Sequence, residues 1–228
     1  MRKGEVTTVK KNEVFPLTIT GMSSEGYGVG RHENMAVFVP LAAVGDQLVV
    51  RAVKVKDRYA YGKIEEILFP ASCRIQPDCP VSRQCGGCAY RHLSSQEEQR
   101  LKLQQVNDAL QRIGGVNSPV TEILSTGRER YRNKAQYPLC SVEGRIVVGF
   151  YAPHSHRVIP YWNCLLTPEC FEPLLHTVTE FLERHHIPVY NEVTHTGVAR
   201  HIYIRWGEVT EEIMVCLVAN ATHIPAEK

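Results

Sequence analysis

The sequence lacks any hydrophobic run long enough to cross a membrane. A transmembrane helix needs about 20 consecutive apolar residues, and no apolar stretch of the 228-residue chain approaches this length. Residues Met1–Glu5 also lack the apolar core of a secretory signal peptide. These absences predict a cytoplasmic protein with no membrane partner.

A glycine-rich nucleotide loop is absent as well. Gly26, Gly28 and Gly30 do not have the spacing of the G-x-G-x-x-G motif, and they come before an expected strand rather than a helix. No expected strand leads through a glycine-rich turn into a helix, as a nucleotide-binding α/β unit requires. Cys216 lies inside the apolar run Ile213–Val218 and is interpreted as a small buried hydrophobe rather than a nucleophile. The sequence therefore offers no catalytic and no cofactor-binding residue.

The chain carries a net charge of only +2, but its charged residues are unevenly distributed. Residues 71–165 contain 12 Lys and Arg against 7 Asp and Glu, whereas residues 166–228 contain 4 against 9. A basic middle segment indicates a surface that faces a polyanion. Ordinary solvent-exposed charge explains the same counts, so both interpretations stay open.

What the sequence does have is eight cysteines. Without a secretion signal they indicate a reducing compartment, where thiols bind metals more often than they form disulfides. Cys79, Cys85 and Cys88 stand in one short run, and Cys164 lies far downstream. The two glycines between Cys85 and Cys88 tolerate the close backbone approach that a metal-binding loop needs, so these four thiols are candidate metal ligands.

Two kinds of metal site compete for these cysteines. Structural zinc usually draws on two Cys-x2-Cys pairs, or on one pair with histidines, and here there is a single such pair. Three clustered cysteines with a remote fourth are a common arrangement around an iron–sulfur cluster. The spacing favours iron–sulfur over zinc, and both over disulfides or inert thiols. Cys73 and Cys140 are alternatives for one of the four ligands.

Short strands separated by glycine-rich turns fill residues 1–69. They are expected at 14–20, 36–39, 47–53 and 58–67, with no helix between them. Four or five such strands in this length predict a small closed β-barrel of the OB type. Such barrels often bind single-stranded nucleic acid through basic and aromatic side chains, for which the candidates are Lys54, Lys56, Arg58, Tyr59, Tyr61 and Lys63. Strand-surface charge and core tyrosines explain the same residues.

Residues 70–228 mix helices and strands. A helix is expected at 94–113, where serines offer N-caps, one face is apolar and two glycines follow. Hairpin strands are expected within 128–164, a second helix at 168–185, and two more strands at 199–206 and 213–219. The predicted fold class is therefore a β-rich α+β protein: an OB-like barrel in 1–69, then an α+β domain in 70–228 whose cysteine loop occupies 70–93.

Several segments together resemble a known family. Residues 1–69 are similar to a TRAM domain, a small RNA-binding β-barrel, from the glycines at 26–30 through Phe38–Pro40 to residues 59–67. The cysteine run, the expected first helix and three further segments resemble the bacterial 23S rRNA uracil-C5 methyltransferases; these segments are Tyr131–Lys134, Asn163–Cys164 and Thr196–His201. The similarity covers essentially the whole chain, and the cysteine pattern is its most specific part.

The resemblance implies a cluster, a cofactor and a partner. In that family the four cysteines ligate a 4Fe-4S cluster, which implies that role for Cys79, Cys85, Cys88 and Cys164. Family members also bind S-adenosylmethionine in a Rossmann-like domain that carries the catalytic cysteine. No such domain is recognisable in this sequence, so the chain is expected to be the N-terminal and central part of such an enzyme, inactive without the missing C-terminal methyltransferase domain. The helix at 94–113 is expected to dock on that missing domain.

The implied role is to hold 23S rRNA while the target uracil is unstacked for methylation. Basic residues are the candidate phosphate contacts, and the predicted RNA-binding residues are Arg58, Lys63, His92, Arg128, Arg130, Arg132, Lys134, Arg145 and Arg157. Tyr131 and Tyr137, like His92, are candidates for base stacking. The alternatives are a free-standing RNA-binding iron–sulfur protein and a zinc-stabilised nucleic-acid module, neither of them catalytic.

Overall fold

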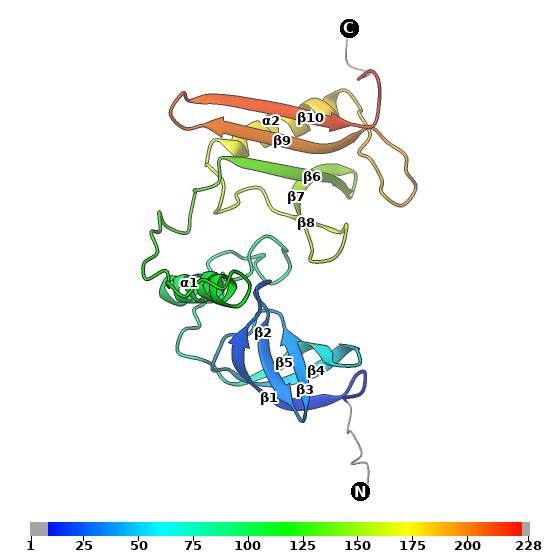
Figure 1. Ribbon diagram of the computed structural model, residues 1–228. Helices are drawn as coiled ribbons and strands as arrows, with labels where there is room; N and C mark the ends of the chain where they lie inside the picture. The colour runs from blue at the N-terminus through cyan, green and yellow to red at the C-terminus, as the bar shows by residue number, and fades with distance from the viewer. Residues whose placement is uncertain (1–8, 225–228) are drawn as a thin grey trace, which may run out of the picture. The chain divides into compact units, whose positions relative to one another are not determined.

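The computed structural model describes residues 9–224, which divide into two compact units (Figure 1). The first unit contains the chain up to Asp78 together with Ala89–Ser125. The second contains Cys79–Cys88 together with the chain from Thr126 onward. The predicted domain boundary between residues 69 and 70 stays a prediction. The two compact units meet at other positions along the chain, after Asp78, Cys88 and Ser125. None of the described helices is long and apolar enough to span a membrane.

Five strands form a closed barrel in the first unit. They are β1 (Val14–Met22), β2 (Gly28–His32), β3 (Met35–Val39), β4 (Gln47–Val55) and β5 (Tyr59–Phe69). Their order around the barrel is β1-β2-β3-β5-β4, and only the pairing of β3 with β5 is parallel. Alternate residues point inward, as the pleat of a strand requires, so that Leu17, Val37 and Val50 are among the buried core residues.

Asp46, in the turn before β4, ties the segment after the barrel to the barrel itself. Its side chain is fully buried and accepts hydrogen bonds from the amides of Ala43 (2.6 Å) and Ala71 (2.9 Å). The Arg74 guanidinium donates to both of its carboxylate oxygens and also to the Leu41 carbonyl. Burial alone would raise the pKa of Asp46, but the hydrogen bonds from Arg74 and the two amides outweigh it and hold this pKa below its ordinary value.

Helix α1 (Ser95–Arg112) packs within the first unit. Ser94 caps it by accepting a hydrogen bond from the Glu97 amide, as a serine at an N-cap commonly does. Leu101 is buried in a small cluster with Ala43 and Leu93. The C-terminal part of the apolar stripe is open to solvent, since Ile113 is 88% exposed. Docking of this helix on another domain stays a prediction.

The second unit is an antiparallel sheet covered on one face by a helix. Its strands, in the order β10-β9-β6-β7-β8, are β10 (Glu212–Ala219), β9 (Ala199–Gly207), β6 (Lys134–Val142), β7 (Arg145–Tyr151) and β8 (Val158–Pro160). Helix α2 (Phe171–Arg184) buries Phe171, Leu175 and Leu182 in a core with Tyr137, Ile202 and Ile204 of β6 and β9. The opposite face of the sheet is not part of this core.

Candidate cysteine centre and nucleic-acid surfaces

The loop Cys79–Cys88 belongs to the same unit as Cys164 and lies against the end of β7. The Gly86 amide donates to the Tyr151 carbonyl at 3.0 Å. A Cβ atom at position 86 would lie 3.1 Å from this carbonyl oxygen and 3.3 Å from the Pro153 nitrogen, so the loop approaches β7 as closely as a glycine allows. Within the loop the Gly87 amide donates to the Cys85 sulfur at 3.3 Å.

Arg130 fixes the turn that carries Cys164. Its guanidinium donates to the carbonyl oxygens of Cys164 (3.0 Å) and Thr167 (2.8 Å), and its backbone amide donates to the Leu165 carbonyl. Tyr137 supports the same turn from the core, because its hydroxyl lies 3.1 Å from that of Thr167. Burial raises the pKa of this tyrosine to about 12. The position of Cys164 is thus set by side chains of the preceding segment and of β6.

Three of the four predicted ligands lie close enough to interact electrostatically. Burial raises the pKa of Cys85, and the neighbouring Cys164 and Cys79 thiols raise it further. Burial also raises the pKa of Cys164, and Cys79 adds to it. Arg132 acts in the opposite direction on both thiols. Cys88 is partly buried at the end of the same loop.

The two alternative ligands lie elsewhere. Cys73 belongs to the first unit, where its thiol lies 3.9 Å from the Val44 carbonyl oxygen. Cys140 is in β6, and burial is the sole cause of its raised pKa. The assignment of the four metal ligands stays a prediction; Cys79 and Cys164 lie near enough to Cys85 to affect its pKa, and Cys79 also affects that of Cys164.

A single metal ion has no ready site in the described part of the chain. Residues 9–224 contain no group of three His, Cys, Asp or Glu side chains that could hold one. Four thiolates around one zinc, each about 2.3 Å from it, would have to lie within about 4 Å of one another. The gathered cysteines are therefore not closed around one ion of this kind.

An aromatic surface covers the outside of the barrel around Tyr61. The rings of Tyr27, Phe38 and Tyr59 have their centroids 6.0, 5.8 and 5.7 Å from that of Tyr61, and the Lys54 ammonium lies 5.9 Å from the same ring. Phe38 and Tyr61 are partners across the parallel pair of β3 and β5. We call Tyr27, Phe38, Lys54, Tyr59 and Tyr61 the barrel patch. Such a combination of rings and cations suits the stacking of unpaired bases.

The residues predicted to bind RNA lie in different environments. Most of them are exposed; these are Arg58, Lys63, Arg132, Lys134, Arg145 and Arg157. Arg128 is half-buried. Arg130 is half-buried as well, with its guanidinium engaged in the Cys164 turn, so the structure gives it a positioning role instead.

The structure corrects two of the stacking candidates. His92 is only 5% exposed, and its Nε2 atom lies 3.2 Å from the Ala42 carbonyl oxygen. Tyr137 is fully buried. Neither ring can stack on a base, whereas Tyr131 is 54% exposed. The sequence shows the aromatic character of these residues but not the side of the strand or turn on which each ring lies.

Comparison with known proteins identifies the barrel. Residues 8–64 match the family model of the TRAM domain, which confirms the TRAM prediction. The chain is 38% identical over 218 residues to an uncharacterized RNA methyltransferase of Clostridium tetani, covering 95% of this chain and 47% of that protein. It is also 38% identical over 222 residues to an uncharacterized RNA methyltransferase of a Nostoc species, covering 96% and 48%. The chain spans about half the length of these curated relatives.

Among solved structures, the chain resembles the Pyrococcus abyssi tRNA (uracil-54, C5)-methyltransferase in complex with S-adenosyl-L-homocysteine. The TM-score is 0.68 at 22% sequence identity, and the match covers 92% of this chain and 47% of that one. At this identity the likeness concerns the fold.

This match overturns the predicted fold class. The prediction combined an OB-like barrel and an α+β domain with the absence of a Rossmann-like methyltransferase domain, but 92% of the chain matches the fold of the solved methyltransferase structure. The prediction rested on the lack of a glycine-rich turn between a strand and a helix. The glycine-rich turn identifies one kind of nucleotide-binding unit. Its absence does not decide which fold the strands of this chain adopt. The expectation of a missing methyltransferase domain is therefore withdrawn.

Proposed function

We propose that this chain binds RNA for an RNA methyltransferase that transfers a methyl group from S-adenosylmethionine to C5 of uracil. The observation that carries the proposal is the similarity to RNA methyltransferases over 95% of the chain. The fold shared with a tRNA (uracil-54, C5)-methyltransferase bound to S-adenosyl-L-homocysteine supports both the uracil and the methyl donor. The TRAM match supports RNA as the substrate.

The chemistry explains why an RNA-binding surface is needed. A base inside a helix must leave the stack before an enzyme can reach its ring carbons. Proteins hold such single-stranded RNA by stacking on its bases and by charge on its backbone. The barrel patch offers both features, with Tyr59 and Tyr61 beside Lys54. Exposed Arg58 and Lys63 extend the positive charge along the same hairpin.

We propose a 4Fe-4S cluster as the resident group of the cysteine centre. Its donor set would be the four thiolates of Cys79, Cys85, Cys88 and Cys164, which is the usual ligation of such a cluster. The amide of Gly87 directed at the Cys85 sulfur suits a thiolate ligand. A cluster of four irons spreads its thiolates farther apart than one ion does, so the lack of a site for a single ion in residues 9–224 does not argue against it.

The role proposed for this cluster is structural. Four protein thiolates leave no iron open for a substrate, so the cluster would supply a crosslink rather than reaction chemistry. It would join the loop Cys79–Cys88 to the turn that Arg130 holds at Cys164. The exposed Arg132 and Lys134 follow Arg130 in sequence, so the crosslink would also steady the start of a basic segment.

The substrate we propose is 23S rRNA, with tRNA as the competitor because the structural neighbour acts on tRNA. The test measures RNA binding by fluorescence anisotropy over a range of salt concentrations. Tyr61→Ala removes the central ring of the barrel patch and should weaken binding about fivefold or more, since stacking on one ring contributes about 1–3 kcal/mol. Arg112→Gln, on the exposed end of α1, is the matched control and should leave binding unchanged.

Two results would contradict the proposal. One is a chain that binds neither a 23S rRNA fragment nor tRNA at low salt. The other is binding that does not weaken as salt rises, because phosphate contacts release counterions and must show that dependence. If tRNA binds more tightly than the rRNA fragment, the proposed substrate is tRNA instead of 23S rRNA, and the RNA-binding role stays in place.

A further inference from the structure

The face of the second sheet that α2 does not cover has a defined composition. Residues directly opposite each other on paired strands share a face, and the pairings across β10, β9 and β6 give three rows. The rows are Met214–Arg205–Lys134, Cys216–Tyr203–Gln136 and Val218–His201–Pro138. We call these nine residues the open face; all of them are at least partly exposed except Pro138, which is buried. The intervening residues, such as Ile202 and Ile204, point into the core beneath α2.

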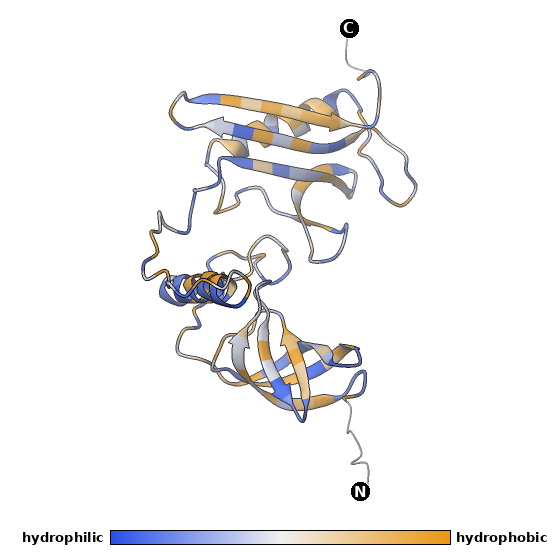
Figure 2. Cartoon of the chain, viewed as in Figure 1, coloured by the Kyte–Doolittle hydropathy of each residue, from blue (hydrophilic) through white to orange (hydrophobic). Residues whose placement is uncertain are grey.

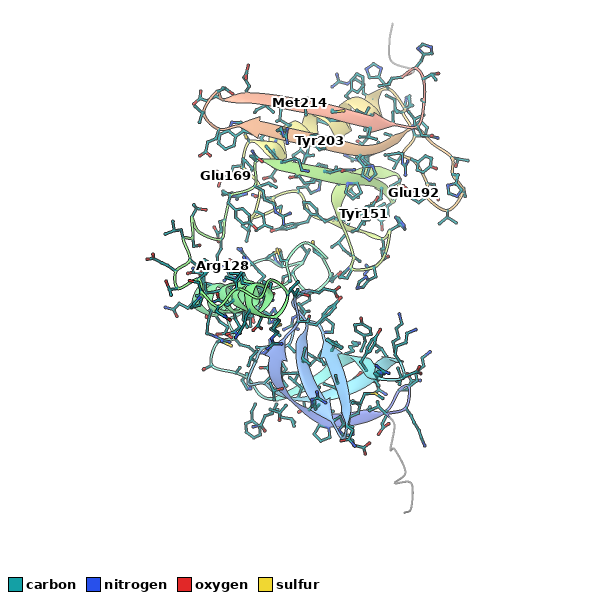
Figure 3. The ribbon with its side chains drawn as sticks, in the orientation of Figure 1. Arg128, Tyr151, Glu169, Glu192, Tyr203 and Met214 are labelled. Atoms are coloured by element: carbon teal, nitrogen blue, oxygen red, sulfur yellow. The ribbon has the colours of Figure 1, made fainter. Side chains whose placement is uncertain are left out.

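The two faces differ sharply in polarity. Hydrophilic and hydrophobic residues alternate along β6 and β9 in Figure 2, because one face of these strands is core and the other is not. On the open face Lys134, Gln136 and Arg205 are exposed, and Tyr203 is half-exposed between them. Figure 3 shows Tyr203 on β9 and Met214 on the neighbouring β10.

Tyr203 lies at the centre of this face with cations around it. The Lys134 ammonium is 5.7 Å from the Tyr203 ring centroid. Arg205 pairs with Lys134 across the two strands, so two positive side chains lie side by side. Like charges directly opposite each other destabilise a sheet. Neither side chain has an ion-pair partner within residues 9–224. An anionic ligand would relieve the repulsion between Lys134 and Arg205. The half-exposed Tyr203 ring beside them could stack on a flat group of the same ligand.

The open face is connected to the cysteine centre through Tyr151. Its hydroxyl lies 3.0 Å from Nε2 of His201 on the open face, and its backbone carbonyl accepts the Gly86 amide of the cysteine loop. One residue of β7 therefore contacts both features. A ligand on the open face would lie near the strand that contacts the loop Cys79–Cys88.

We propose that the open face binds single-stranded RNA. An unpaired base stacks on Tyr203, while Lys134 and Arg205 contact the flanking phosphates and Gln136 offers its amide to the base edge. The inference rests on the proposed RNA-binding function, and it adds a second contact surface to the barrel patch. Charge favours RNA over an apolar protein partner, because an apolar interface would leave Lys134 and Arg205 without counterions.

The experiment uses the whole chain and a labelled single-stranded oligouridylate. Tyr203→Ala should weaken binding about fivefold or more, and Tyr203→Phe should keep most of it, because the ring and not the hydroxyl stacks. The double variant Lys134→Gln, Arg205→Gln should lower the slope of log affinity against log salt by about 1.4, or about 0.7 for each phosphate contact to a single strand. Arg184→Gln, at the exposed end of α2, is the matched control and should change neither quantity.

A second measurement locates the base and does not depend on altering the fold. Ultraviolet crosslinking with 4-thiouridine in the oligonucleotide should label a peptide that contains residues 199–207. Crosslinks confined to the barrel would overturn the inference. The inference would also be wrong if Tyr203→Ala and the charge double variant both bound RNA with wild-type affinity while Tyr61→Ala bound it more weakly. That result would leave the proposed function standing.

Two further outcomes separate the hypotheses. If the wild-type chain binds no RNA, both the open-face inference and the proposed function fail. If sedimentation shows a dimer that Tyr203→Ala dissociates, the open face is a contact between two copies of the chain and the inference is wrong. Circular dichroism of each variant shows that a loss of binding is not a loss of fold.

Discussion

At the scale of single residues, the type of side chain did not reveal its role. Arg130 and Arg132 stand two positions apart and were both predicted to contact phosphates. Arg132 is exposed, whereas the Arg130 guanidinium donates to the Cys164 and Thr167 carbonyls. The difference depends on which carbonyl groups the fold leaves unpaired near each arginine. No pattern in the sequence contains that information.

Asp46 is the shared acceptor of several polar groups in the first unit. Replacing it by alanine leaves the largely buried Arg74 charge and two backbone amides without their acceptor. We expect Asp46→Ala to lower the free energy of unfolding by about 3–5 kcal/mol, the usual cost of breaking a buried ion pair on one side. Urea denaturation measures this. Glu65→Ala, which removes the exposed partner of Arg51, should cost far less, because solvent screens an ion pair at the surface.

The same residue makes stability depend on pH in a known direction. Because the pKa of Asp46 is lowered in the folded state, its contribution is present above the ordinary carboxyl value of about 3.9. It is lost as the pH falls below this value through the folded-state pKa. The wild type should therefore lose more stability than Asp46→Asn on acidification from about pH 5 to 2. Equal losses in the two proteins would contradict this assignment.

At the scale of helices and strands, the sequence predicted most elements well. The expected helices at 94–113 and 168–185 lie within three residues of α1 and α2, since caps and apolar periodicity mark helix ends. The hairpin strands expected within 128–164 are present as β6, β7 and β8. Strand β2 was read as a turn because Gly28 and Gly30, usual turn residues, are instead buried in the barrel.

The pairing of strands could not be predicted in the same way. β9 pairs with both β6 and β10, although β6 and β9 are far apart in sequence. The open face depends on this pairing, because Lys134 and Arg205 become neighbours only through it. Periodicity says which residues share a face of one strand, but not which strand lies beside it.

Gly149 allows β7 and β8 to pair. A Cβ atom at this position would lie 1.9 Å from the Ile159 carbonyl oxygen, which is closer than any real contact. Gly149→Ala should therefore push the two strands apart and lower the free energy of unfolding by about 1–3 kcal/mol or more. Gly21→Ala is the control, because a Cβ there meets nothing within 4 Å. Thermal denaturation compares them, and equal melting temperatures would show that β8 moves without cost.

At the scale of the whole molecule, each unit has its own core. The barrel core contains Phe15 and Leu48, and the core of the second unit contains Phe171 and Ile202. Loss of an internal crosslink in one unit should therefore leave the unfolding of the other largely unchanged.

Cys164→Ser tests this expectation together with the proposed cluster. After anaerobic purification the wild type should contain about four irons and four sulfides per chain, and the variant should lose them. The second unit should then unfold at a lower temperature, while the barrel transition keeps its position. Cys216, which was predicted to be buried, is exposed on β10, so that prediction was wrong. Cys216→Ser is the control and should retain the iron. Stoichiometric zinc without sulfide in the wild type would refute the cluster.

The division of the chain also sets the order in which its parts become available during synthesis. The loop Cys79–Cys88 belongs to the second unit, although α1 and its neighbours, which follow it, belong to the first. Residues 89–163 must still be translated before Cys164 emerges, which takes roughly 4–15 s at common ribosome speeds. For that interval the three thiols of the loop are without the fourth. A nascent polypeptide of this design would be most vulnerable to oxidants at this stage, well before release from the ribosome.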